Sequence, residues 1–159
     1  MKIILNQRTE RLRADRHRLI GLTRYLMRRA TSRTDPGRWA CVSLLLADDR
    51  EMARWNAAAF GHPEPTDVIS YAYPPALPGE PGWTGEIAVN AARARRFGPR
   101  HRGPAFELAL YVAHGCDHLC GGDDATPAGR RLMRRRELRW LAGAARRGLL
   151  EDLLPGERP

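Results

Sequence analysis

Residues 104–124 read PAFELALYVAHGCDHLCGGDD. A proline opens this stretch and a glycine pair, Gly121-Gly122, comes near its end, which is the arrangement typical of the start and the end of a helix. The stretch therefore predicts a helix over residues 104–119, which the chain leaves at the glycines. Two histidines near the helix end and two aspartates after the glycines concentrate potential metal ligands here.

On either side of this helix, strand-like and helical patterns alternate. Short runs of β-branched, aromatic or apolar residues predict strands over residues 2–5, 41–47, 67–73 and 85–90. Helical spacing and capping signals predict further helices over residues 10–30, 48–60, 91–97 and about 127–147. The order of these elements predicts an α+β fold in which a mixed sheet of about four strands packs with about five helices. We expect a single compact domain over residues 1–154 and a C-terminal tail over 155–159.

Length and composition fit one globular domain. The chain has 159 residues, of which 43% are hydrophobic and 28% are charged, close to the average for folded domains. Its three cysteines, Cys41, Cys116 and Cys120, are too few for a disulfide framework. No apolar run approaches the roughly 18 residues of a membrane span, and the N-terminus has no signal-peptide core. We therefore expect a cytoplasmic protein with no membrane partner.

The charge balance favours a polyanionic partner. The formal net charge is +9, and of the 27 basic residues only Lys2 is a lysine. Arginine suits bidentate contacts with phosphate. A coding bias toward arginine explains much of the ratio of arginine to lysine, but it does not explain the net positive charge.

The central feature is the ligand cluster at the end of the predicted helix. His114 and His118 are four residues apart, so both imidazoles project from one helix face and can reach one ion. The glycines then allow the chain to turn back, so that Asp124 can face the same ion. Two imidazoles and one carboxylate form a set that zinc accepts, and three protein ligands leave a position open for water. Such a site is typical of hydrolysis by metal-bound water.

Other interpretations of the same residues remain. Two histidines at this spacing can be ordinary polar groups on a partly buried helix. The spacing also matches the zinc-binding motif of metzincin proteases, but Gly115 stands where those enzymes carry their catalytic glutamate. Met133 lies in a helical context, which favours packing over a protease Met-turn. Asp123 is expected to orient a ligand or to cap the next helix.

The cluster HGCDHLCGGDD resembles the HGxLHLxGYDH signature of the YbeY-type bacterial endoribonucleases, or rRNA maturation factors. The resemblance extends upstream, where Asn56, Gly61 and residues 65–71, PTDVISY, resemble the LN…G…PTDVLSF stretch of that family. Residues 85–87, GEI, resemble its GDI strand. Order and spacing agree over about residues 48–140.

The resemblance implies one α+β domain with one zinc ion, or another divalent metal, that acts as a single-strand-specific endoribonuclease in 16S rRNA maturation and ribosome quality control. The implied metal ligands are His114, His118 and Asp124, and the two histidines would act in catalysis through the metal-bound water. Asp124 replaces the third histidine of the family, and a carboxylate shifts the preference somewhat toward harder ions. The family places an arginine where this chain has Phe60.

Two further positions follow from the resemblance. Asp117 stands where the family usually has a leucine, and we expect its side chain to face solvent. Thr66-Asp67-Val68 would border the cleft, although capping of the following strand explains these residues equally well.

A run of arginines follows the ligand cluster directly. We expect Arg130, Arg131, Arg134 and Arg135 to contact RNA, since a cleaved phosphodiester becomes more negative in the transition state. Arg136 and Arg139 extend the run. The alternative is a solvated helix face. An apolar stripe of Leu132, Met133, Trp140 and Leu141 is expected to seat the helix.

The predicted function is therefore a metal-dependent endoribonuclease with rRNA and the ribosome or a small-subunit precursor as partners, and with no DNA substrate expected. Two alternatives remain open. A non-catalytic RNA-binding assembly factor could use the same basic surface with a structural metal, and a zinc metalloprotease is less favoured because its glutamate is absent.

Overall fold

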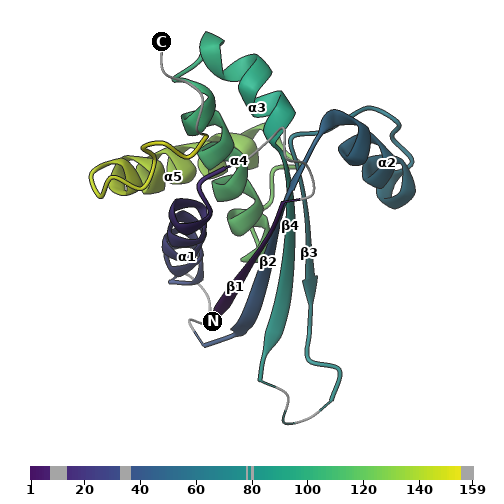
Figure 1. The fold of residues 1–159 in the computed structure, drawn as a ribbon. Coiled ribbons are helices and arrows are strands. Elements are labelled where there is room, and N and C mark those ends of the chain that lie inside the picture. The colour runs from purple at the N-terminus through teal and green to yellow at the C-terminus, as the bar shows by residue number, and fades with distance from the viewer. Residues whose placement is uncertain (8–13, 33–36, 78, 80, 155–159) are drawn as a thin grey trace.

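A four-stranded mixed sheet lies at the centre of the described part of the chain (Figure 1). The structure is a computed structural model, and it describes residues 1–7, 14–32, 37–77, 79 and 81–154. The strands are β1 (Lys2–Gln7), β2 (Trp39–Ala47), β3 (Val68–Tyr73) and β4 (Trp83–Asn90), in the order β1-β2-β4-β3. β1, β2 and β4 run parallel, whereas β3 is antiparallel to β4. The α+β fold class predicted from the sequence is confirmed.

Helices cover one face of the sheet more completely than the other. α1 (Arg16–Thr31), α4 (Pro104–Leu119) and α5 (Pro127–Ala145) lie on one side, and α2 (Asp49–Phe60) lies on the opposite side (Figure 1). α3 (Ala91–Phe97) and the short 3-10 helix η2 (Gly98–Arg100) connect β4 to α4. α4 contacts α1, α3, α5 and both strands β3 and β4, so it occupies the central position expected from its sequence.

Alternation along the strands builds the core. Leu44 and Leu46 on β2 and Ile87 and Val89 on β4 are buried in one cluster with the apolar faces of α1 and α4. Each fully buried aliphatic side chain of this kind contributes about 1.5–3 kcal/mol to stability. A smaller cluster around Met52 of α2 packs on the other face. The sheet is therefore anchored mainly through α1 and α4, and α4 carries the ligand residues at its end.

The predicted bounds agree closely for most elements. The helix predicted over residues 104–119 coincides with α4, and that over 91–97 coincides with α3. Asp48 caps α2 by accepting a hydrogen bond from the Glu51 backbone N–H, as predicted. The first helix was predicted from residue 10, but α1 begins at Arg16 after the cap Asp15. Residues 8–13 and the tail over 155–159 lie outside the described residues.

Two smaller expectations concern loops and membranes. The segment over residues 74–82 was expected to be a loop long enough to cover a site. Its described residues lie at the far end of the β3–β4 hairpin in Figure 1, and none of them lines the large pocket described below. None of the helices described is both long and apolar enough to span a bilayer.

Candidate metal centre

The last two turns of α4 bring both histidines to one point. The Nε2 atoms of His114 and His118 lie 3.1 Å apart, and the ring planes meet edge to face at 76°. This is the approach expected for side chains four residues apart on a helix. Both rings are partly exposed, and His114 lines a pocket, so an ion between them would reach solvent.

The turn after α4 returns the chain to the histidines. Gly121 has a left-handed φ of 80°, and the N–H of Gly122 donates to the Asp117 carbonyl at 2.8 Å. Only glycine adopts this φ without strain. Asp124 then lies with Oδ2 at 3.4 Å from the His114 Nε2 and Oδ1 at 3.8 Å from the His118 Nε2. The sequence predicted that these three residues would converge, and the structure brings their ligand atoms within 4.8 Å of one another.

The other ring nitrogens of the histidines have partners that orient the rings. The His114 Nδ1 lies 2.7 Å from Oε1 of Glu137, whose side chain is 2% exposed. The His118 Nδ1 lies 3.0 Å from the Gly122 carbonyl oxygen. Since both partners are acceptors, each Nδ1 carries a proton, and in the neutral rings both Nε2 lone pairs point at the same space. Two Nε2 lone pairs that face each other repel, and a cation between them would remove this repulsion.

The donor set fits zinc. Ligands at about 2.0–2.1 Å in a tetrahedral arrangement lie roughly 3.3 Å from one another, near the 3.1 Å and 3.4 Å separations found here. A carboxylate and a histidine pair with partners on the distal nitrogens is also typical of metal sites. The arrangement is compatible with other divalent ions, because the Asp124 oxygen suits harder metals.

The surroundings also favour positive charge at His114. Burial lowers its pKa, but the hydrogen bond and the charge of Glu137, together with the charges of Asp67 and Asp124, outweigh burial and raise the pKa of His114 above its ordinary value. The same carboxylates that stabilise an imidazolium stabilise a bound cation. The site is thus electrostatically prepared for a metal even though the molecule as a whole is basic.

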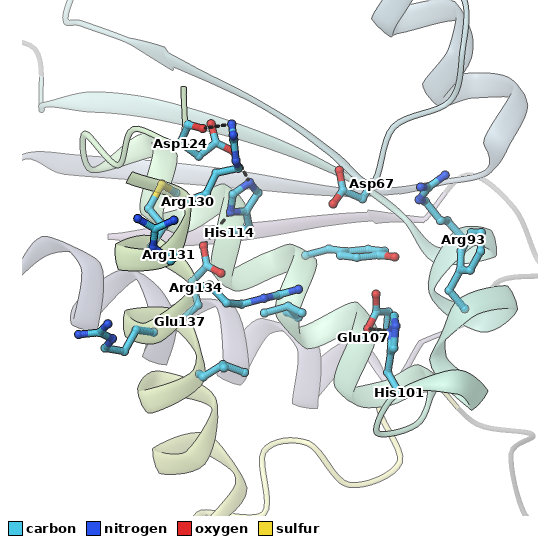
Figure 2. Close-up of a pocket in the computed structure, with 16 residues that line it drawn as sticks. Asp67, Arg93, His101, Glu107, His114, Asp124, Arg130, Arg131, Arg134 and Glu137 are labelled. Carbon is cyan, nitrogen blue, oxygen red and sulfur yellow. Dashed lines mark hydrogen bonds and ion pairs between the residues drawn. The ribbon is translucent and has the colours of Figure 1, made fainter. Parts of the chain in front are cut away.

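A pocket of about 750 Å³ opens beside the histidines (Figure 2). This volume lies within the range of ligand-binding sites. Arg130, Arg131, Arg134 and Arg135, which the sequence singled out for RNA contact, all line the pocket from α5. Arg130 also donates from Nη1 to the backbone carbonyl of Asp124 at 2.9 Å, which ties α5 to the ligand loop.

Sequence reasoning missed a polar group in the other half of the pocket. Glu107 is buried, accepts a hydrogen bond from Tyr111 and has Oε2 at 2.9 Å from the His101 Nδ1. Burial, followed by the charge and the hydrogen bond of Glu107, raises the pKa of Tyr111 far above its ordinary value. Arg93 and Phe97 of α3 complete this half. These residues are separated from the ligand motif in sequence, and no local spacing signals that they share a pocket.

Asp67 satisfies both of the interpretations that the sequence left open. Its Oδ1 accepts from the Val68 N–H and from the Thr66 hydroxyl, each at 3.0 Å, so it caps the start of β3. The residue also lines the pocket, and Figure 2 shows it between the metal centre and Arg93. Phe60, at the position of the family arginine, is 55% exposed, stacks on Tyr71 and does not line this pocket.

Three expectations about side chains were wrong. Asp117 does not face solvent but is 0% exposed, because Arg136 reaches it from α5 with two hydrogen bonds of 2.7 Å. The Arg136 guanidinium is therefore buried in an ion pair and does not line the pocket, unlike Arg134 and Arg135. Leu132 does not seat α5 but is 55% exposed, whereas Met133, Trp140 and Leu141 are buried as predicted. Of the two roles expected for Asp123, capping of α5 is wrong, since Thr126 caps it and the Asp123 carboxylate accepts from the Ala125 N–H. Orientation of a ligand by Asp123 stays a prediction.

The packing at Gly115 weighs against the protease interpretation. A Cβ atom at this position would lie 2.5 Å from the Cγ2 of Ile87 and 3.1 Å from that of Val68. The residue faces the sheet, and the histidines face the pocket. A glutamate at this position would have to enter the packed contact between α4 and the sheet, so the site has neither the base nor the room for it.

The chain was compared with known proteins. A family profile described as Endoribonuclease YbeY matches residues 4–144. A protein named Endoribonuclease YbeY from Thermobifida fusca is 35% identical over 149 residues, which cover 87% of this chain and 91% of that protein. One of the same name from Chelativorans is 37% identical over 112 residues, 68% of each chain. The solution structure of a Thermotoga maritima protein matches with a TM-score of 0.58 at 22% identity, covering 98% of this chain and 99% of that one, which supports the fold alone.

Proposed function

Because the chain belongs to the Endoribonuclease YbeY family, we propose that it is a metal-dependent endoribonuclease that cleaves single-stranded RNA in 16S rRNA maturation and ribosome quality control. Family membership supports the RNA-cleaving role. The metal dependence, the zinc ion and the rRNA substrate are our own assignments, and so is the cytoplasmic location where this substrate is found.

One observation carries the metal assignment. The two histidine Nε2 atoms face each other at 3.1 Å while both Nδ1 atoms are held by acceptors, and the Asp124 carboxylate closes the third side. His114, His118 and Asp124 would hold the ion. When bound, a divalent ion supplies Lewis-acid chemistry and lowers the pKa of a coordinated water molecule.

The other residues of the pocket would position the strand. The guanidinium groups of Arg130, Arg131, Arg134 and Arg135 line the same pocket as His114 and would balance the charge of a phosphodiester held there. Glu137 also lines this pocket, and its buried carboxylate would orient His114. The pocket is open to solvent beside Asp124, whose side chain is 38% exposed, so a flexible strand can enter.

A metal analysis combined with a cleavage assay tests the proposal. We expect the purified protein to carry about one equivalent of zinc or another divalent ion and to cut single-stranded rRNA fragments in preference to duplexes or DNA. His114→Ala should lose both metal and cleavage while staying folded by circular dichroism. His62→Ala, an exposed histidine outside the pocket, is the matched control and should keep both.

A second candidate is a non-catalytic RNA-binding assembly factor, and Phe60 favours it because no cation stands at the position of the family arginine. The same assay separates the two functions. Metal-loaded protein that binds single-stranded rRNA with its ion at full occupancy, but leaves the strand intact, would establish the assembly factor and refute the nuclease. Cleavage of casein instead of RNA would refute both.

A further inference from the structure

The half of the pocket that lies away from the metal centre has no part in holding the ion. Arg93, His101 and Glu107 line this half, and Asp67 stands between it and His114 (Figure 2). Phe97, which contacts Arg93, and Tyr111, which forms a hydrogen bond with Glu107, line the same pocket. The whole pocket is about 750 Å³, far more than the roughly 30 Å³ of one water molecule. A ligand that fills it must therefore extend from the metal centre toward α3.

The carboxylates of this half already have donors. Glu107 accepts a hydrogen bond from Tyr111, and its Oε2 lies 2.9 Å from the His101 Nδ1. The Asp67 Oδ1 accepts from Thr66 and Val68. Neither carboxylate lies within ion-pair distance of Arg93, and no other acidic residue in the described part of the chain does.

Arg93 is instead held by an aromatic ring. Its guanidinium carbon lies 4.9 Å from the centre of the Phe97 ring, and the residue is half-buried in the pocket wall. A cation–π contact fixes the direction of the guanidinium while leaving its N–H donors available. A half-buried guanidinium in a pocket wall without a carboxylate partner is suited to an anionic ligand.

We propose that Arg93 binds a second phosphate of the substrate strand, next to the phosphodiester at the metal centre. This inference rests on the proposed function, since it assumes that the ligand is a nucleic acid strand. Phe97 positions Arg93, and Arg93 is a binding residue that does not touch the cleaved bond. The subsite would set the shortest strand that binds well, because an oligonucleotide with a single phosphate cannot occupy both positions.

Arg96 provides a matched control on the same helix. Its guanidinium carbon also lies 4.9 Å from the Phe97 ring, but it pairs with Asp49 and does not line the pocket. Arg93→Gln and Arg96→Gln therefore remove the same charge and the same kind of ring contact. Only the first removes a cation from the pocket.

The test uses metal-loaded protein and fluorescein-labelled oligouridylates of two, three and six nucleotides, with anisotropy read before cleavage is measurable. We expect Arg93→Gln to weaken binding of the three- and six-nucleotide strands about tenfold, and to reduce the salt slope by about 0.7. Binding of the dinucleotide should not change. In kinetics with the six-nucleotide strand, KM should rise and kcat should stay the same. Arg96→Gln should behave as the wild type in every assay.

The outcomes separate this inference from the proposed function. Equal weakening at all three lengths, or equal effects of the two variants, would overturn the subsite even if the protein cleaves RNA. A length-dependent loss at Arg93 in a protein that never cleaves RNA would support the subsite and refute the nuclease. A folded Arg93→Gln protein, shown by an unchanged melting temperature, that binds all strands as the wild type does would also overturn the subsite.

Discussion

The distal nitrogen of His114 governs how well the proximal nitrogen binds an ion. Glu137 accepts from this nitrogen at 2.7 Å and is 2% exposed, so the interaction is shielded from water. A carboxylate in this position selects the tautomer, orients the ring and increases its basicity. Glu137 is the only acidic residue of α5, in the middle of an arginine run. The sequence alone shows that Glu137 is a single acidic residue among arginines. It does not show that this residue contacts His114.

Glu137→Gln keeps the shape of the side chain and removes its charge. We expect zinc affinity to fall about 10–100-fold, because an amide polarises the imidazole less than a carboxylate does. Competition against a chromophoric chelator measures the change. Glu107→Gln is the control, since Glu107 is also buried and also lies beside a histidine Nδ1, but that histidine is His101. An equal loss in both variants would show that Glu137 acts through general pocket charge and not through His114.

As a ligand of the proposed ion, Asp124 would set the balance between metals. Replacing it by histidine, as in Asp124→His, exchanges the only oxygen ligand of the set for a nitrogen. We expect the ratio of zinc to manganese affinity to rise roughly tenfold or more, since imidazole suits zinc while carboxylate suits harder ions. Parallel titrations with both metals measure the ratio. An unchanged ratio would mean that the side chain at position 124 does not bind the ion.

At the scale of elements, the contact between α4 and α5 contains a buried ion pair. Asp117 and Arg136 are joined by two hydrogen bonds of 2.7 Å, and Arg136 also lies over the Trp140 ring. Removal of one partner leaves the other charge buried. We expect Asp117→Leu or Arg136→Met to lower the free energy of unfolding by about 3–5 kcal/mol. Urea denaturation of the metal-loaded protein measures it.

The double variant Asp117→Leu, Arg136→Met should recover most of this loss, because an apolar pair of similar volume avoids the desolvation cost. Arg96→Gln breaks the exposed pair with Asp49 and should cost no more than about 1 kcal/mol. Strictly additive losses in the double variant would contradict the idea that the two charges depend on each other.

Gly115 controls the approach of α4 to the sheet. In Gly115→Ala the added Cβ would meet the Cγ2 of Ile87 at 2.5 Å, so α4 or β4 must shift. We expect a loss of about 1–3 kcal/mol in the free energy of unfolding, together with weaker metal binding because the histidines move with the helix. Gly79→Ala, in the hairpin loop where a Cβ would meet nothing within 4 Å, should not affect metal binding. Full stability and unchanged metal affinity in Gly115→Ala would contradict the packing argument.

The same two helices show where sequence analysis stops. The bounds of α4 and the convergence of His114, His118 and Asp124 follow from local spacing, and local spacing was enough to predict them. The burial of Asp117 depends on an arginine 19 residues away that a folded neighbour brings to it. The buried face of α5 includes Arg136 and Glu137, so a search for apolar residues selected exposed Leu132 in their place. A charged residue can be buried when another helix supplies its partner, and a hydrophobic pattern does not predict such burial.

At the scale of the whole molecule, the sequence indicated four strands and a mixed sheet but could not order them. The order β1-β2-β4-β3 places β3 and β4 side by side, and α4 contacts both strands. This pairing brings Asp67, at the start of β3, and Arg93, after β4, into the pocket of the histidines. The three candidate metal ligands come from one local stretch, whereas the pocket around them is assembled by topology. Local residues were therefore predictable and distant ones were not.

The net charge of +9 belongs to the whole molecule, but only the arginines that line the pocket would contact a strand bound there. A variant with Arg130, Arg131, Arg134 and Arg135 changed to Gln loses four charges from the pocket. A second variant with four exposed arginines outside the pocket changed to Gln, at Arg24, Arg28, Arg50 and Arg54, loses the same charge elsewhere.

We expect the variant that loses the pocket arginines to reduce the slope of log affinity against log salt by up to about 3 for single-stranded RNA. The second should leave the slope almost unchanged, because exposed charges beyond a Debye length of about 8–10 Å are screened. Anisotropy titrations over a range of salt concentrations measure both slopes. Equal reductions in the two variants would show that RNA affinity depends on the total charge of the molecule and not on the pocket arginines.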